Sequence, residues 1–317
     1  MTADRITEPC YVSDHADGRP PVSTYRCRYC RHVHDGSAPH CPLCGAPIDI
    51  TARVTDSGWM EQPMIADMTR LRCGDTRCQI AGTIVPVVEF DLGRGDWIYF
   101  SLHALLWTDA VTTVRTMAYV NADALRDRQT AGLSVIMLEA HGPGHIGVSD
   151  NHAGELIAVP LGRGHQVLAH PSRFLCATGN VAYDWQRTGI HYRKWRGAER
   201  ESEYPIGRYH DSFAARDKQG LLLLHSPGNT FVRDLGADES ILVQPSSLVY
   251  WDATVNLALH LEHPRNAGVP NANDRQNYRI IWLRLGGPGR VAVQSVYEPA
   301  ESTGKLDHFS FGSIRMW

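Results

Sequence analysis

The stretch DLGRGDWIYFSLHALLWTDAVTTV, residues 91–114, decides the fold because the chain repeats its pattern twice. PLGRGHQVLAHPSRFLCATGNVAY follows at 160–183 and DLGADESILVQPSSLVYWDATVNL at 234–257, and the three align without gaps. Each opens around Leu-Gly, continues through a polar turn into an alternating strand, and ends in a second short apolar strand. Because a period of two is typical of β-strands, this repeat predicts three equivalent β units.

A second element accompanies each segment, an apolar strand that runs into a Pro-Gly turn. LSVIMLEAHGPG ends at Gly144, GLLLLHSPG at Gly228 and RIIWLRLGGPG at Gly289, and a further strand follows each. Proline at the second turn position and glycine at the third predict type II turns, because the third position has positive φ. The pattern therefore predicts three hairpins. Their structural turn residues are Gly142, Pro143, Gly144, Pro227, Gly228, Pro288 and Gly289.

These patterns, with 28 glycines and 18 prolines and little sign of helix, predict an all-β body. Three equivalent units packed about a common core predict a pseudo-threefold β-prism or a barrel-like sandwich.

The composition is that of a globular protein. Of 317 residues, 43% are hydrophobic and 21% charged, which excludes a mostly disordered chain. The formal net charge of -3 gives no overall attraction to nucleic acid or anionic membranes, although a local patch would still bind either. No run approaches the roughly 18 apolar residues of a membrane-spanning helix. The first twenty residues lack the apolar core of a secretory signal, so we expect a cytoplasmic protein.

Four cysteines near the N-terminus form two C-x2-C pairs, Cys27 with Cys30 and Cys41 with Cys44. Without a secretory signal, a disulfide framework is not expected, and paired C-x2-C units suit a tetrahedral Zn(II) held by four thiolates. Gly45 supplies the permissive backbone that such a knuckle needs. Four thiolates leave no open coordination position, so the expected zinc is structural rather than catalytic.

Two alternatives stay open at this cysteine cluster. The four sulfur ligands would also suit iron, or the cysteines would be redox-active dithiols without a metal. His32, His34 and His40 lie between the pairs and are alternative ligands. Elsewhere, Cys73 and Cys78 form a C-x4-C pair that we expect to be two reduced thiols, and Cys176 lies in an apolar run and is expected to be buried.

The Leu-Gly strands and the Pro-Gly turns resemble the mitochondrial-biogenesis AIM (altered inheritance of mitochondria) family, whose function is unknown. The matching stretches are QIAGTIVPVVEFDLGRGDWIYF, HGPGHIGV with PLGRGHQVLAHPSRFLCAT, and LGGPGRVAVQS, and the resemblance spans roughly residues 75–298. It implies a fold like that of the ring-forming tryptophan RNA-binding attenuation proteins (TRAP), a short double-stranded β-helix. It implies no catalytic residues, because the matching motifs are structural.

The predicted domain organisation follows from these segments. It comprises a flexible tail at 1–22, a zinc ribbon at 23–50, a linker at 51–74, the three-repeat AIM-like β domain at 75–300 and a C-terminal extension at 301–317.

No catalytic residues are predicted. Among the sixteen histidines, none forms the H-x-H motif with a following Glu that is typical of cupins, and the chain has neither a G-x-S-x-G elbow nor a P-loop. One turn position of the repeat holds Asp96, His165 and Glu239 in turn. This variation predicts a solvent-facing turn rather than three copies of a ligand. A cupin-like metal enzyme is the other alternative.

The most basic stretch is a candidate patch for an anion, nucleic acid or protein partner, formed by Arg193, Lys194, Trp195 and Arg196. Basic groups interleaved with aromatic rings suit single-stranded nucleic acid and anionic lipid surfaces. The acidic sequence ERESEY follows directly and is expected to neutralise part of this charge.

The sequence therefore favours a non-enzymatic scaffold or adaptor. We expect its β body to self-assemble and its ribbon to contact a protein partner, with a nucleic-acid or anionic-membrane binding module as the alternative. No small-molecule substrate is indicated.

Overall fold

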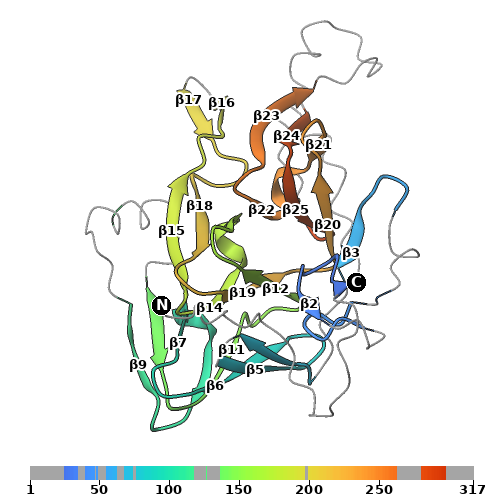
Figure 1. Ribbon diagram of the computed structural model, residues 1–317. Coiled ribbons are helices and arrows are strands. Elements are labelled where there is room, and N and C mark those ends of the chain that lie inside the picture. The colour runs from blue at the N-terminus through green and yellow to red at the C-terminus, as the bar shows by residue number, and fades with distance from the viewer. Residues whose placement is uncertain are drawn as a thin grey trace, which may run out of the picture.

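The computed structural model is built almost entirely of β-strands (Figure 1). It describes residues 25–34, 40–46, 48, 55–62, 68–73, 76–117, 126, 136–196, 199–262 and 280–297. The all-β prediction is confirmed. The expected tail at 1–22 and extension at 301–317 lie outside the described residues.

The three segments that align in the sequence adopt the same succession of elements. Each lies in a unit in which a 3-10 turn follows the second strand. Unit 1 consists of β6 (Val87–Leu92), β7 (Trp97–Ser101), η2 (Leu102–Ala104), β8 (Leu105–Thr108), β9 (Thr113–Thr116), β10 (Met137–His141) and β11 (Gly144–Ser149). Unit 2 consists of β12 (Glu155–Leu161), β13 (Gln166–Ala169), η3 (Pro171–Arg173), β14 (Phe174–Thr178), β15 (Val181–Arg187), β18 (Tyr209–Ala215) and β19 (Gly220–Ser226). Unit 3 consists of β20 (Thr230–Leu235), β21 (Ser240–Val243), η4 (Pro245–Ser247), β22 (Leu248–Asp252), β23 (Asn256–Glu262), β24 (Ile280–Gly286) and β25 (Gly289–Gln294).

Further strands precede the units or are inserted in them. The inserted strands form a hairpin within unit 2, β16 (Tyr192–Arg196) with β17 (Glu199–Glu203). The preceding strands are β1 (Tyr25–Arg26), β2 (Val33–His34), β3 (Met60–Gln62), β4 (Arg70–Cys73) and β5 (Thr76–Ala81). The stretch at 51–74 was expected to be a linker. Within it, β3 pairs with β20 and β4 pairs with β5, so both join the sheets of the body.

Within each unit the last strand pairs with the first and the third strands, which gives the groups β6-β11-β8, β12-β19-β14 and β20-β25-β22. The other three strands of each unit form the groups β7-β10-β9, β13-β18-β15 and β21-β24-β23. The leucine of each Leu-Gly pair faces a glycine across the first group: Leu92 opposite Gly144, Leu161 opposite Gly220, and Leu235 opposite Gly289.

The Pro-Gly turns are corners between sheets, so the prediction of hairpins is wrong. β10 and β11 do not pair with each other but belong to different groups, and the same holds for β24 and β25. The Gly142–Pro143 and Gly287–Pro288 peptide bonds are cis, a turn geometry that differs from type II. The turn signal in the sequence places a change of direction correctly, but it does not say which strand becomes the partner.

Glycine is required at these corners because two backbones meet there. A Cβ on Gly142 would lie 2.3 Å from the carbonyl oxygen of Gly93, and one on Gly287 would lie 2.2 Å from that of Gly236. The Leu-Gly motif and the Gly-Pro-Gly motif are therefore two halves of one contact, and a side chain on either Gly142 or Gly287 would push them apart.

The turn at Pro227 and Gly228 occupies a different place in the fold. It connects β19 with β20 and so lies between units 2 and 3. Because Gly220 faces Leu161, the corner of unit 2 that corresponds to the Gly-Pro-Gly corners is the segment before Gly220. The sequence hides this equivalence, because residues 216–219 contain no proline.

Neighbouring units are joined by pairing of the third strand of one with the second strand of the unit before it. β14 pairs with β7, and β22 pairs with β13, both antiparallel. These junctions produce two long sheets, β12-β19-β14-β7-β10-β9 and β15-β18-β13-β22-β25-β20-β3. The strands β4 and β5 extend the group β6-β11-β8.

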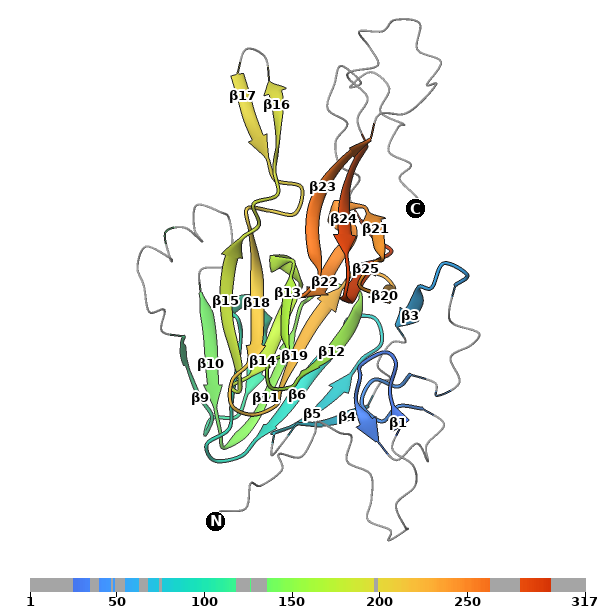
Figure 2. The ribbon, with the colours of Figure 1, turned by 45° about the horizontal axis from the view of Figure 1, so that its top comes forward.

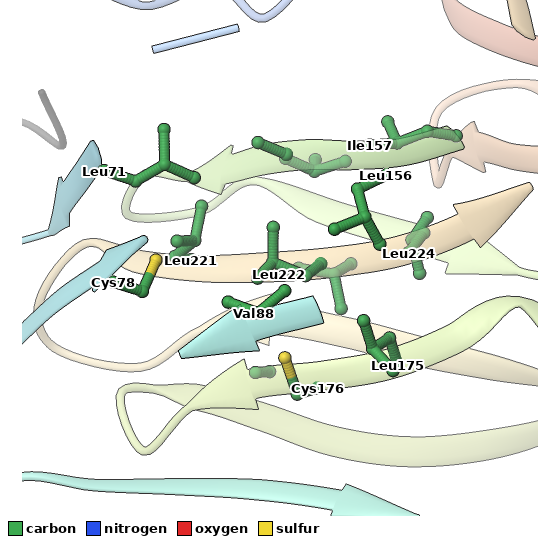
Figure 3. Close-up of a cluster of buried hydrophobic side chains, with 14 of the residues drawn as sticks. Leu71, Cys78, Val88, Leu156, Ile157, Leu175, Cys176, Leu221, Leu222 and Leu224 are labelled. Atoms are coloured by element: carbon green, nitrogen blue, oxygen red, sulfur yellow. The ribbon is translucent and has the colours of Figure 1, made fainter. Parts of the chain in front are cut away.

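The hydrophobic core lies between these sheets (Figure 3). Leu71, Cys78 and Val88 come from β4, β5 and β6, and they meet the leucines of β12 and β19, including Leu222. β19 is buried along its whole length, which explains why its sequence is a continuous apolar run instead of an alternating one.

The body cysteines are buried beside these leucines. Cys176 is a fully buried free thiol, as predicted, and burial raises the pKa of Cys78 to about 12. Cys73 is disulfide-bonded, so the expectation of two reduced thiols holds for Cys78 alone. Among the described residues, no helix is long and apolar enough to cross a membrane.

Candidate metal centre and its contact with the body

The four predicted ligands come together as a compact group of sulfur atoms. The side-chain sulfurs of Cys27, Cys30, Cys41 and Cys44 lie within 4.8 Å of one another, and all four residues are buried. The Sγ atoms are 3.6 Å apart for Cys27 and Cys44, and 3.6 Å apart for Cys30 and Cys41. Tetrahedral bonds of roughly 2.3 Å to a metal place sulfur ligands about 3.8 Å apart. The group therefore has the size and donor atoms of a four-thiolate metal site.

Two knuckles with the same backbone geometry build this group. The amide of Arg31 donates to the carbonyl of Cys27, and that of Gly45 donates to the carbonyl of Cys41, each at 2.9 Å. The residue after each pair is left-handed, with φ 64° at Arg31 and 71° at Gly45. The role predicted for Gly45 is confirmed, whereas the left-handed arginine was not anticipated from the sequence.

The thiols influence one another strongly. Burial raises the pKa of Cys30, whereas hydrogen bonds from the other three thiols lower the pKa of Cys27. A metal ion displaces thiol protons from such a site, because only the thiolate is a good ligand. Metal binding at this group is therefore expected to release protons.

The histidines considered as alternative ligands lie outside the sulfur group. The ring of His32 is buried and stacks on that of His34, with 6.0 Å between the ring centroids. Burial lowers the pKa of His32 to about 4, and His40 is exposed. These positions favour packing and surface roles for the histidines.

The ribbon, residues 25–34 and 40–46, lies beside the body (Figure 2). A buried arginine of the body makes the contact between them. Arg290 directly follows Gly289, the last residue of the Gly-Pro-Gly corner of unit 3, and its side chain is 4% exposed. Its guanidinium donates to the carbonyl oxygens of Arg28 and Tyr29 in the first knuckle. It also donates to both carboxylate oxygens of Asp234, at 2.8 and 2.7 Å.

Arg31 makes the return contact from the ribbon. Its guanidinium donates to Asp252 at 2.9 Å and to Asp234 at 3.2 Å. Asp252 is also within 2.9 Å of the ring of His165 and accepts the amide of Arg290 at 2.7 Å. Burial alone would raise the pKa of Asp252, but His165, Arg31 and the amide of Arg290 lower it to about 2. The carboxylate is therefore charged at neutral pH.

A small pocket remains at this contact, lined by Tyr29 and Arg31 on the ribbon side and by Pro160, His165 and Tyr250 on the body side. Its free volume of about 10 Å³ is room for about one water molecule. This pocket is too small for a substrate.

The variable turn position has two different roles. Asp96 and Glu239 accept the amides of Gly93 and Gly236 in their own turns, at 3.1 and 2.8 Å. His165 instead reaches Asp252 in the next unit. The expectation of a solvent-facing turn therefore fails at His165, which lies at the contact with the ribbon.

The predicted basic patch lies on the hairpin of β16 and β17, which projects from the body (Figures 1 and 2). The register places Lys194 opposite Glu201 and Arg196 opposite Glu199. Arg193 is exposed, and the side chains of residues 194–201 lie outside the description. Acidic residues thus face the basic ones along the backbone register, as the neighbouring ERESEY sequence suggested.

The contact residues Arg31, Asp234, Asp252 and Arg290 were not predicted from the sequence. The available signal was a comparison of the repeats. Asp91 and Asp109 occupy the positions of Asp234 and Asp252, but unit 1 has His145 where unit 3 has Arg290.

Comparison with known proteins agrees with the resemblance found in the sequence. Residues 78–296 match the family model described as Mitochondrial biogenesis AIM24. The chain is also similar to the crystal structure of protein SPYM3_0169 from Streptococcus pyogenes, with 20% identity and a TM-score of 0.51. That likeness covers 70% of this chain and 94% of the other, and it concerns the fold alone. No curated protein matches.

Proposed function

We propose a non-enzymatic scaffold function for this chain, which belongs to the mitochondrial-biogenesis AIM24 family. In this proposal the three units assemble with other copies of the chain, and the ribbon carries a structural Zn(II) and serves as the contact for a protein partner. The observation that carries the proposal is a pair of complementary open strand edges, one in the first unit and one in the last.

The two junctions between units within the chain show which strand edges would pair in an assembly. At the junction of units 1 and 2, Tyr99 of β7 faces Ala177 of β14. At the junction of units 2 and 3, Leu168 of β13 faces Trp251 of β22. In both pairs the residues occupy the same two positions of the gapless alignment. One rule therefore joins the units: the second strand of one unit pairs with the third strand of the next unit in the same register.

The rule leaves one strand without such a partner at each end of the described body. β8 pairs with β11 on one side, and β21 pairs with β24 on one side. No described strand pairs with the outer edge of either. The same rule would place Leu242 of β21 opposite Thr108 of β8 in another copy. Unpaired edges of this kind favour association with further strands.

The side chains at these two edges support association. Leu106 and Trp107 on β8 are 50% and 46% exposed, and Leu242 on β21 is 43% exposed. Large apolar side chains at an open edge lose unfavourable contact with water when a second strand covers them. Because the two edges differ, the contact would be head-to-tail and would produce a closed ring or a filament.

Cysteine cross-linking tests the pairing directly. Chains with Thr108→Cys mixed with chains with Leu242→Cys should form a covalent dimer under mild oxidation, because directly opposed residues have Cα atoms close enough for a disulfide. The control combines Thr108→Cys with Ser240→Cys, two residues out of register, and should cross-link far less. A chain carrying both Thr108→Cys and Leu242→Cys should give a ladder of oligomers. A cross-linked monomer would show that unit 3 closes on unit 1 of the same chain and would refute the proposal.

Native mass spectrometry of protein purified gently from its own cells tests the rest of the proposal. It should show a multimer with one zinc per chain and a retained protein partner. A monomer that carries a second metal or a small molecule would favour an enzyme or ligand-binding module instead. A cytoplasmic location is part of this proposal. The reduced thiolates that a zinc site needs favour it, whereas the disulfide of Cys73 opposes it.

The hairpin of β16 and β17 supports a second proposal, binding of nucleic acid or anionic membranes. The observation in its favour is the projection of the basic strand from the body (Figure 2). Reversing the charge of Arg193, Lys194 and Arg196 should abolish binding to single-stranded RNA and to phosphatidylserine vesicles. Unchanged association with both would exclude this function.

A further inference from the structure

The first cysteine knuckle is held by the body through its backbone. The carbonyl oxygens that Arg290 binds belong to Arg28 and Tyr29, the two residues between Cys27 and Cys30. Their direction depends on the conformation of the knuckle, which a metal ion fixes by joining the two cysteines to the second pair. The body thus recognises the shape of the metal-binding loop itself.

Arg31 provides a second and independent observation. It adopts a left-handed conformation that the twin knuckle assigns to Gly45, and this conformation is unfavourable for residues other than glycine. An arginine stands there although glycine would relieve the strain. Its guanidinium reaches Asp234 and Asp252 of the body, and strained backbone of this kind commonly marks a functional contact.

We propose that the ribbon is a metal-dependent latch on the body. With a metal ion on the four cysteines, the first knuckle presents two carbonyls and Arg31 in the geometry that Arg290, Asp234 and Asp252 bind. Without the metal, the four crowded sulfurs lose the charge that holds them together, the knuckle loses its shape, and the ribbon leaves the body. The proposal depends on metal binding and is independent of head-to-tail assembly.

Release of the ribbon would expose Arg290 and Asp252, which are covered in the docked state, beside Asp234, which is already half exposed. Arg290 is buried, and the side chain of Asp252 is 10% exposed. Once the ribbon has left, the carboxylates of Asp234 and Asp252 lose Arg31, and Arg290 loses its two carbonyl acceptors. Metal occupancy therefore decides whether this charged surface is covered.

Thermodynamic linkage makes the latch measurable at the metal. If the metal favours docking, docking favours the metal by the same factor. Residues of the body that do not contact the metal should therefore change its affinity. A ribbon that merely lies near the body would show no such effect.

Hydrogen exchange on the full chain tests the latch. The metal is removed with EDTA and its loss is confirmed by elemental analysis. Protection should fall in the first knuckle and, in the body, at residues 250–252 and 289–292, while the core strand at 221–224 keeps its protection. Unchanged protection at 289–292 would overturn the proposal. So would equal loss of protection at 221–224, because ribbon and body would then unfold as one unit.

Cobalt(II) affinity, measured from the thiolate charge-transfer absorption in competition with a chelator, tests the linkage. Asp252→Asn should weaken Co(II) binding about ten-fold, the effect of losing one charge-assisted hydrogen bond. Its matched control is Asp109→Asn at the same repeat position in unit 1, where the carboxylate contacts His145 instead of the ribbon, and it should leave the affinity unchanged.

The Co(II) assay also tests the ribbon residue of the contact, with the variant Arg31→Ala. This change should also weaken Co(II) binding about ten-fold. The control Arg28→Ala removes an exposed side chain but keeps the carbonyl that Arg290 binds, so it should bind Co(II) normally. Wild-type affinity in both Asp252→Asn and Arg31→Ala would refute the latch.

Discussion

The corner of unit 1 and the corner of unit 3 use the same backbone contact for different purposes. In unit 1, Asp109 accepts the amide of His145 at 2.8 Å. In unit 3, Asp252 accepts the amide of Arg290 at 2.7 Å. In both, the carboxylate fixes the residue that follows the corner glycine, so this contact belongs to the fold.

The side chains that leave these corners behave differently. The side chain of His145 is 51% exposed, and its ring forms a hydrogen bond of 3.1 Å with Asp109, the same residue that accepts its amide. Arg290 is 4% exposed and reaches past Asp234 to the ribbon. A change of side chain at one repeat position thus converts a local cap into a binding site for another module.

Unit 2 shows the contact without charge. There the hydroxyl of Thr178 accepts the amide of Leu221 at 3.0 Å, inside the buried core. All three corners have a hydrogen-bond acceptor at this position, and the carboxylate occurs at the two corners where it also contacts a basic side chain.

The largest effect is expected from a variant that loses the metal, because the corner of unit 3 should then behave like the corner of unit 1. Cys41→Ser should lose the metal and unfold the ribbon, because structural zinc supplies on the order of 10 kcal/mol to such modules. Hydrogen exchange at Arg290 should then approach that at His145, while calorimetry still shows a cooperative transition of the body.

The control for this variant is Cys176→Ser, in the core of the body. It should lower the melting temperature of the body and leave the metal content unchanged. If Cys41→Ser also abolishes the transition of the body, then ribbon and body form one folding unit.

A second change makes unit 3 resemble unit 1. Arg290→His removes the charged donor to the two knuckle carbonyls and one of the two cationic partners of Asp234. Because the carbonyls lose charge-assisted hydrogen bonds, the protein should be destabilised by about 2 to 3 kcal/mol. The reciprocal His145→Arg, at an exposed position, should change stability little. Denaturant unfolding of both variants measures the contrast, and equal losses would show that the ribbon contact contributes nothing.

Acid should remove the stabilising contribution of Asp252. The folded pKa of Asp252 is about 2 and its unfolded pKa is about 3.9, so its contribution is present above about pH 4 and is lost as pH falls toward 2. At neutral pH this contribution is roughly 2 kcal/mol. Asp252→Asn should therefore destabilise the protein at pH 7 and make almost no difference near pH 2. A destabilisation that persists at pH 2 would contradict the assignment.

The smallest effect is expected at His145. Its hydrogen bond to Asp109 raises its pKa, so its ionic contribution is present below about pH 6.5 and disappears as pH rises through the raised folded value. His145→Asn should destabilise the protein slightly at pH 5 and not at pH 9. Thermal melts at the two pH values measure this, and the opposite order would refute it.

The sequence predicted the β architecture because a repeat reports which residues are equivalent. It did not predict the corners, since an apolar strand before Gly142 and Pro143 has the same pattern whether it reverses into a hairpin or enters another sheet. It also missed Gly220, because the corner of unit 2 lacks proline.

The metal ligands were predictable because the cysteine spacing itself encodes the geometry. The contact of the ribbon with the body was not, because Arg290 and Tyr29 lie far apart in the chain and backbone carbonyls leave no mark in the sequence. Only the departure from the repeat, arginine where unit 1 has His145, pointed to it.

The position of Arg290 near the end of the body has a consequence during protein synthesis. The ribbon is complete once Cys44 leaves the ribosome, but its binding site requires strand β25 (Gly289–Gln294). At translation rates of 5–20 residues per second, the intervening chain takes roughly 10–50 s to make. Throughout that time the ribbon would be metal-loaded yet undocked, and available to chaperones or to a partner before the finished body competes for it.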